Sequence, residues 1–202
     1  MTQAVSNDTK APVKLMTPVF RVSFPHLFRP SDNKTEDGKA KYQLSMLFPP
    51  GTDLALLKKA ARECAEQHFN GKIPPRLKTP FLDAGTYEYE GYEPGWTLIR
   101  VSTTTKPGVV DQNVQPIIDE AEFYPGCWAR ATVTVYGWTF KGNNGVSFGL
   151  QNVQKIKDDD SFGGGRRKAE DDFAPVEGAS TGDDIFGGAA NEAADATDGL
   201  FD

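Results

Sequence analysis

Residues 127–140 alternate between two chemical classes, and this alternation is the sharpest chemical signal in the chain. One parity holds small or apolar side chains, namely Cys127, Ala129, Ala131, Val133, Val135, Gly137 and Thr139. The other parity holds four aromatic rings, one arginine and two threonines, namely Trp128, Arg130, Thr132, Thr134, Tyr136, Trp138 and Phe140. Period-two alternation predicts a β-strand with one buried face. Aromatic rings on the opposite face either pack beneath another segment or stack on unpaired bases, which all present a π-face.

Cations on neighbouring predicted strands would complete a binding surface for a phosphate backbone. Arg21 and Arg100 lie on the outward parity of their strands, and Trp96 shares the parity of Arg100. We therefore predict that ten residues contact single-stranded DNA: Arg21, Trp96, Arg100, Lys106, Trp128, Arg130, Tyr136, Trp138, Phe140 and Lys141. Further candidates for phosphate contacts are Lys41, Lys78 and Lys155.

Charge is divided unevenly along the chain. Residues 1–157 carry 19 basic and 15 acidic side chains, a net charge of +4, whereas residues 158–202 carry 3 basic and 13 acidic ones, a net charge of −10. A mildly basic body attracts phosphate, and an acidic segment competes for that surface or recruits partners. The pI of about 5.0 for the whole chain hides this division.

The acidic segment repeats one short pattern, in which a phenylalanine follows one or more acids. The pattern occurs at residues 170–173, 183–186 and 198–202. Acidic peptides with an apolar anchor dock into basic-rimmed hydrophobic pockets. We predict that partner proteins, such as a DNA polymerase, helicase or nuclease, recognise Asp183, Asp184, Phe186, Asp198, Phe201 and Asp202.

The rest of the pattern predicts a mainly β fold with one helix. Strands are expected at residues 13–24, where Pro25 ends the strand, and at 42–48, 96–104, 127–140 and 146–156, the last two joined by a turn at 141–145 with Asn-Gly at its end. A helix is expected at residues 53–69 with Thr52 as its N-cap. Residues 72–95 are rich in Pro and Gly and form a long irregular insertion. Five strands and one helix fit a five-stranded antiparallel OB-fold barrel.

These patterns divide the chain into a flexible arm (1–12), an OB-fold domain (13–157) and a disordered acidic tail (158–202). No apolar run approaches the ~18 residues of a membrane span, and the first residues lack the apolar region of a secretory signal. We expect Cys64 and Cys127 to be buried free thiols in a reducing cytosol. The sequence shows no zinc spacing, P-loop or nucleophile motif, so no cofactor, metal or enzymatic activity is expected. The acids at residues 119–122 lack the further carboxylates of a nuclease.

Several strings are longer than general OB-fold signals. They are Arg21-Val-Ser-Phe-Pro-His-Leu-Phe28, Lys106-Pro-Gly-Val-Val110, Asn113-Val-Gln-Pro116, Phe123-Tyr-Pro-Gly-Cys-Trp-Ala-Arg130 and Gly149-Leu-Gln-Asn-Val-Gln-Lys155. In these strings the chain, over residues 13–173, resembles a family of bacteriophage single-stranded-DNA-binding proteins that was long catalogued as a domain of unknown function. The resemblance implies an OB-fold that binds single strands without sequence preference during replication, recombination or repair. The tail also resembles those of bacterial and T7-type single-strand-binding proteins, except that Asp202 follows the last Phe.

We therefore expect a non-catalytic protein that coats single-stranded DNA in the cytoplasm of an infected bacterial host, as a monomer, a homo-oligomer or a cooperative assembly. Two alternatives stay open from the sequence. A single-strand annealing protein would pair complementary strands, and a protein-interaction OB module would not bind DNA at all.

Overall fold

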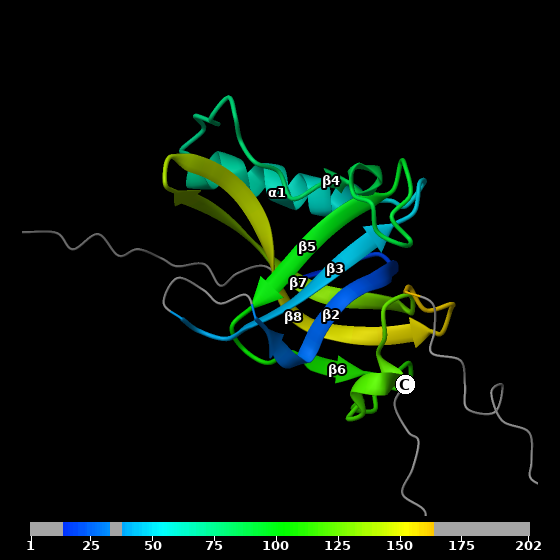
Figure 1. The fold of residues 1–202 in the computed structure, drawn as a ribbon. Coiled ribbons are helices and arrows are strands. Elements are labelled where there is room, and N and C mark those ends of the chain that lie inside the picture. Colours follow the sequence, from blue (N-terminus) through cyan, green and yellow to red (C-terminus); the bar gives the residue numbers. More distant parts are fainter. Residues whose placement is uncertain (1–13, 33–37, 164–202) are drawn as a thin grey trace, which may run out of the picture. The chain divides into compact units, whose positions relative to one another are not determined.

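Five long strands form a closed ring. The computed structural model describes residues 14–32 and 38–163. The ring consists of β2 (Phe20–Ser31), β3 (Lys41–Phe48), β5 (Thr97–Thr103), β7 (Trp128–Phe140) and β8 (Asn143–Lys157) (Figure 1). The pairing order β7-β2-β3-β5-β8 closes because β7 and β8 also pair with each other. The predicted OB-like barrel is confirmed, with one difference, since β5 and β8 pair in parallel while the other ring pairs are antiparallel.

Short elements extend this ring. β1 (Lys14–Met16) pairs with β7, β4 (Leu82–Asp83) pairs with β5, and β6 (Gly108–Val110) pairs in parallel with β8. Two 3₁₀ turns follow Asp83 and Asp119, and each aspartate accepts a hydrogen bond from the backbone two residues later. The predicted insertion between the helix and β5 is present and contains β4 and the first of these turns.

The helix α1 (Ala55–His68) lies beside the β7–β8 hairpin (Figure 1). Thr52 is not its N-cap, because the Thr52 hydroxyl donates to Pro49 O at 2.8 Å, while Asp53 accepts the Ala55 N–H at 2.9 Å. Helical spacing turns Leu57, Ala61 and Ala65 toward the barrel. In the part of the chain that the structure describes, no helix is long and apolar enough to cross a bilayer.

The barrel interior follows the alternation of β7. Ala129, Ala131 and Val133 are at most 1% exposed. Their small side chains leave room for large rings from other strands, and Phe20 and Phe48 meet edge to face with centroids 5.6 Å apart. A second, smaller buried cluster lies outside the barrel, where Leu47, Ala84, Tyr92 and Leu98 pack together.

Two sequence expectations about turns and bulges are wrong. The strand expected at 13–24 is split into β1 and β2, and β2 continues past Pro25 to Ser31 with a register shift between Ser23 and His26. Proline is tolerated there because a bulged residue leaves the ladder. The hairpin turn is shorter than expected, since Lys141 and Gly142, both at positive φ, connect paired residues Phe140 and Asn143. This two-residue turn matches the twist of the flanking strands.

Candidate nucleic-acid interface

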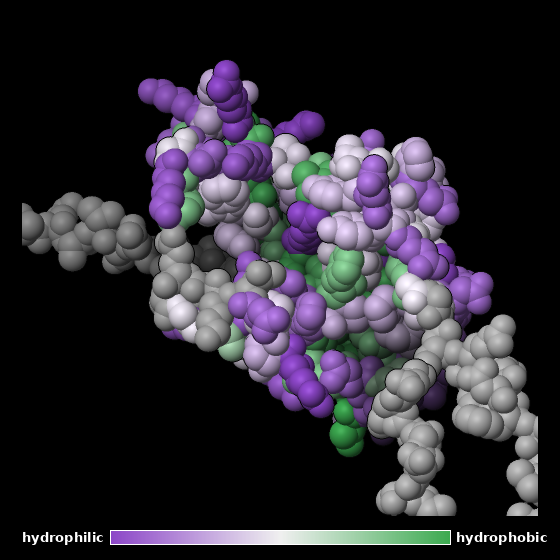
Figure 2. All heavy atoms as spheres, viewed as in Figure 1, coloured by the Kyte–Doolittle hydropathy of each residue, from purple (hydrophilic) through white to green (hydrophobic). Residues whose placement is uncertain are grey.

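A groove runs between strands β3 and β5 and the outer part of the β7–β8 hairpin. Figure 2 shows this region hollowed, with apolar side chains in its floor. Its volume is about 490 Å³, and its floor consists of the buried side chains Leu44, Val101 and Phe148. The walls and rims are Phe24, Lys41, Gln43, Tyr89, Arg100, Ser102, Tyr136 and Ser147. We call these lining residues the groove.

Three partly exposed aromatic rings line the groove. Phe24 is 45% exposed, Tyr89 52% and Tyr136 45%. Phe24 and Tyr89 meet edge to face with their centroids 5.1 Å apart, although they come from β2 and from the insertion. Exposing large aromatic rings to water costs free energy. Three such rings around one hollow therefore favour binding of a ligand with flat apolar faces.

The charge of the groove is positive. Lys41 and Arg100 are its charged lining residues, and none of the described residues that line it is a carboxylate. The Arg100 guanidinium lies over the Tyr87 ring, with Cζ 4.7 Å from the centroid. That contact holds the guanidinium at the groove rim, where it can meet an anion.

The outer part of the β7–β8 hairpin carries four of the residues predicted to bind DNA, namely Tyr136, Trp138, Phe140 and Lys141. Tyr136 lines the groove, as does Arg100 from β5. Trp138 instead packs within the hairpin, where its Nε1 donates to Ser147 Oγ at 2.9 Å and its ring covers Gly145. Phe140 lies near the tip, with Lys141 Nζ 4.9 Å from its ring centroid.

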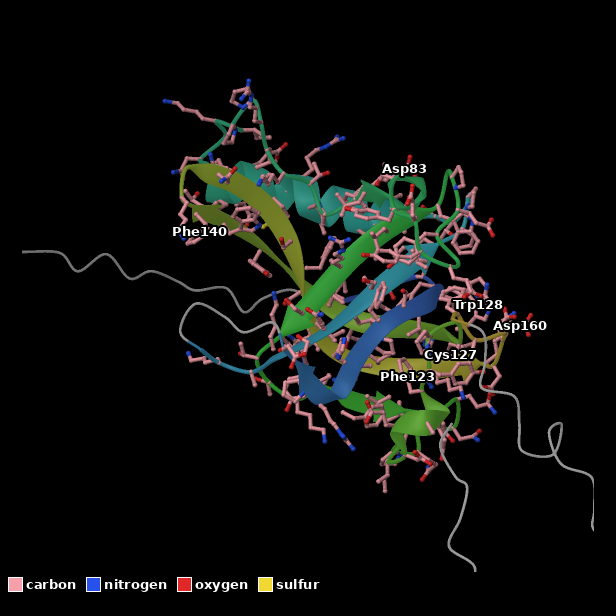
Figure 3. The ribbon with its side chains drawn as sticks, viewed as in Figure 1. Asp83, Phe123, Cys127, Trp128, Phe140 and Asp160 are labelled. Carbon is pink, nitrogen blue, oxygen red and sulfur yellow. The ribbon has the colours of Figure 1, made fainter. Side chains whose placement is uncertain are left out.

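Trp128 lies at the other end of β7 from Phe140, near Asp160 (Figure 3). Arg21 is the residue of β2 that pairs with Trp128. Residues 158–163, which the charge pattern groups with the tail, contact this end of the barrel. Asp159 accepts a hydrogen bond from Trp128 Nε1 at 2.6 Å and pairs with Arg21 at 3.4 Å. The Trp128 hydrogen bond, followed by the backbone N–H of Asp160, lowers the pKa of Asp159. These two predicted DNA contacts are therefore engaged within the chain and lie apart from the groove lining.

A second carboxylate, that of Asp158, pairs with a lysine at the same end of the barrel. Asp158 lies 2.6 Å from Lys155 Nζ and accepts the Tyr124 hydroxyl at 2.7 Å. Lys155 and Tyr124 together lower the pKa of Asp158. Partial burial and the Asp158 hydrogen bond raise the pKa of Tyr124 to about 12. Lys155 is thus held by the Asp158 carboxylate and by Glu122 O, to which its Nζ donates at 2.6 Å.

The remaining predicted contacts lie elsewhere. Arg130 is exposed on the outside of β7, where its Nε donates to Gln154 Oε1 at 2.8 Å. Trp96 is half-buried against the Leu47 and Leu98 cluster, and Lys106 is exposed in the loop after β5. The predicted docking residues of the tail, Asp183, Asp184, Phe186, Asp198, Phe201 and Asp202, lie outside the described residues.

Sequence reasoning missed two of the three groove rings. Alternation placed Phe24 with the buried residues Phe20 and Val22, but the bulge and a φ of +45° at Phe24 turn its ring outward. The Phe-Pro pair inside a strand is the signal that predicts such a bulge. Tyr89 comes from the insertion, and no periodicity marks it. Within residues 14–32 and 38–163, no group of His, Cys, Asp and Glu side chains is arranged to hold a metal.

Comparison with known proteins places this chain in a family. The family model for the single-stranded-DNA-binding protein of Enterobacter phage Enc34 matches residues 13–186. Putative protein p50 of Acyrthosiphon pisum secondary endosymbiont phage 1 is 30% identical over 165 residues, which are 76% of this chain and 88% of that protein.

Solved structures show the same fold. The bacteriophage Enc34 single-stranded-DNA-binding protein, in complex with single-stranded DNA, has a TM-score of 0.64 at 23% identity, over 74% of this chain and 89% of that chain. A second structure of the same phage protein has a TM-score of 0.60 at 25% identity, over 79% of this chain and 89% of that chain. The gp2.5 single-stranded-DNA-binding protein of bacteriophage T7 has a TM-score of 0.57 at 13% identity, over 75% and 96%. The family expected from sequence is confirmed, and the chain belongs to the Enc34 family of phage single-stranded-DNA-binding proteins.

Proposed function

We propose that this chain binds single-stranded DNA in the groove and that it does so without sequence preference. The observation that carries this proposal is the meeting of three exposed rings and two cations around one hollow, without a lining carboxylate among the described residues. Phe24, Tyr89 and Tyr136 stack bases, while Lys41 and Arg100 hold phosphates. Stacking and phosphate contacts bind DNA without a chemical reaction, so the proposed function is not enzymatic.

The chemistry of the lining explains why no sequence would be preferred. Stacking on an aromatic ring contributes about 1–3 kcal/mol per base whichever base is present. Lysine and arginine at a rim contact phosphates, which are the same at every nucleotide. Gln43, Ser102 and Ser147 add polar groups that both donate and accept hydrogen bonds, so they adapt to different base edges.

The test is a titration of full-length protein with oligo-dT, comparing Tyr136→Ala with Phe140→Ala. The two rings have the same 45% exposure, but only Tyr136 lines the groove. We expect Tyr136→Ala to weaken binding roughly 5- to 150-fold, which corresponds to one lost stack, and Phe140→Ala to change it much less. Equal losses would move the interface to the hairpin tip. If the Tyr136→Ala and Tyr89→Ala variants both bind oligo-dT as tightly as the wild type, the groove is not the DNA-binding site.

We extend the proposal to the acidic tail. Residues 164–202 carry 3 basic and 10 acidic side chains, a net charge of −7, and a segment of that charge competes with DNA phosphates for Lys41 and Arg100. Deleting residues 164–202 should tighten binding at low salt and should change it little at high salt, where charges are screened. Equal or weaker binding after deletion would oppose the idea. Displaced by DNA, the acid–Phe repeats would recruit a polymerase, helicase or nuclease in the cytoplasm of the infected host.

A further inference from the structure

Residues 158–163 fasten several distant segments together, and we call them the clip. At its start, Asp158 and Asp159 hold Tyr124, Lys155, Trp128 and Arg21, as described above. Asp160 O then accepts a hydrogen bond from Arg21 Nη2 at 3.0 Å. Gly126 has a φ of +106°, and a Cβ there would lie 2.2 Å from Asp160 O. The backbone of the clip therefore occupies space that only a glycine leaves open.

The C-terminal end of the clip contacts the insertion between α1 and β5. The Phe162 N–H donates to Pro125 O at 3.0 Å, and its ring lies 4.6 Å from Arg21 Cζ. A Cβ on Gly91 would lie 2.2 Å from the Phe162 ring, and Gly91 has a φ of +78°. The next residue, Gly163, donates its N–H to the Glu90 carboxylate. The clip thus contacts two consecutive residues of the insertion, Glu90 and Gly91.

Those two residues form the middle of a tight turn that begins at Tyr89. The Tyr92 N–H donates to Tyr89 O at 3.1 Å and closes the turn. Tyr92 is buried, its ring is 5.3 Å from the Tyr89 ring, and its hydroxyl donates to Ser23 Oγ at 3.2 Å. Tyr89 itself stays half-exposed at the groove. Tyr92 thus contacts the Tyr89 ring directly, and the clip contacts the two residues that follow Tyr89 in the turn.

We infer that Phe162 is a positioning residue for DNA binding, which acts by holding the Tyr89 turn in place. This inference rests on the proposed function. Phe162 does not line the groove, so it would act on a bound base indirectly, through the turn that carries Tyr89. A ring that is already ordered in the free protein loses little freedom when a base stacks on it, whereas a loose ring must be ordered during binding.

The test is a double-mutant cycle in the full-length protein, with oligo-dT affinity as the measurement. Phe162→Ala should weaken binding roughly 2- to 13-fold, the range for ordering one interface side chain. The double variant with Tyr89→Ala should bind no more weakly than Tyr89→Ala alone, because the ring that Phe162 positions is already absent. The double variant with Tyr136→Ala should show the product of the two separate losses. Phe162→Leu, which keeps an apolar side chain against Gly91, should lose less than Phe162→Ala and serves if the alanine variant does not fold.

Three results would overturn the inference. The first is wild-type affinity in a folded Phe162→Ala variant, and the second is a loss that multiplies with that of Tyr89→Ala. The third is tighter binding by Phe162→Ala, which would show that the clip covers a nucleotide site at Arg21 and Trp128. Failure of the groove itself has a different signature, since Tyr89→Ala and Tyr136→Ala would then both bind like the wild type.

Discussion

Salt dependence gives the sharpest test of which cations meet the phosphates. For single strands, log K falls with log salt by about 0.7 for each phosphate that a cation neutralises. Lys41 and Arg100 are the groove's charged lining residues, so together they account for a slope of about −1.4. Raising salt from roughly 50 to 200 mM would then weaken binding about sevenfold through these two cations. Lys41→Gln or Arg100→Gln should each reduce the slope by about 0.7.

The assay is oligo-dT titration of each full-length variant at four or more salt concentrations, followed by tryptophan fluorescence. Arg100→Lys separates charge from geometry, because it keeps the slope while it loses the flat contact with Tyr87. Lys59→Gln is the matched control, since Lys59 is an exposed lysine on α1 with a side-chain exposure of 74%. Slopes that stay unchanged in Lys41→Gln and Arg100→Gln, or that fall equally in Lys59→Gln, would refute the assignment of phosphate contacts to the groove.

Three further predictions concern the folded barrel. The pKa of Asp159 is below its ordinary value of 3.8, so the contribution of Asp159 to stability is present above about pH 4 and is lost as the pH falls through the lowered pKa. Asp159→Asn should therefore make Tm fall less steeply with acidification, and an unchanged fall of Tm would contradict this role. Cys127 is buried, and burial raises its pKa to about 11. Iodoacetamide at about pH 8 should therefore modify the half-buried Cys64 well before Cys127, as peptide mass spectrometry of the labelled protein would show. Phe20 is fully buried, and Phe20→Ala should cost about 3–5 kcal/mol in urea unfolding; a loss below about 1 kcal/mol would mean that the barrel interior refills.

The barrel could be predicted from sequence because it depends on local alternation. The small side chains of β7 are buried from Ala129 to Val133, and four of the five long strands lie in the predicted regions with their ends shifted by a few residues, whereas β2 begins and ends seven residues later than predicted. The groove could be predicted only in part. Tyr136 and Arg100 follow from strand parity, but Phe24 depends on a bulge that reverses the side to which its ring points. A one-residue change of register moves a side chain to the other face, and alternation cannot locate such a change.

Long-range contacts explain the other differences. Trp128 shares its parity with Tyr136, yet it is engaged by Asp159, 31 residues later in the chain. Tyr89 reaches the groove from a turn whose place depends on Phe162 and Tyr92. Nothing in the spacing of these residues indicates their contacts, because Trp128 and Asp159, like Gly91 and Phe162, are far apart in the sequence. Residue type indicated the class of ligand, whereas tertiary packing determines which rings line the groove.

Including the clip lowers the net charge of the body. Counted to residue 157, the body has a net charge of +4, but residues 1–163 carry 19 basic and 18 acidic side chains, a net charge of +1. Asp158 and Asp159 contact Lys155 and Arg21 at the Trp128 end of the barrel, whereas Lys41 and Arg100 line the groove. Net charge alone would then attract DNA only weakly, and stacking on Phe24, Tyr89 and Tyr136 must supply most of the affinity that persists at high salt. A shallow salt slope combined with large losses from ring removal is the pattern that this distribution of charge requires.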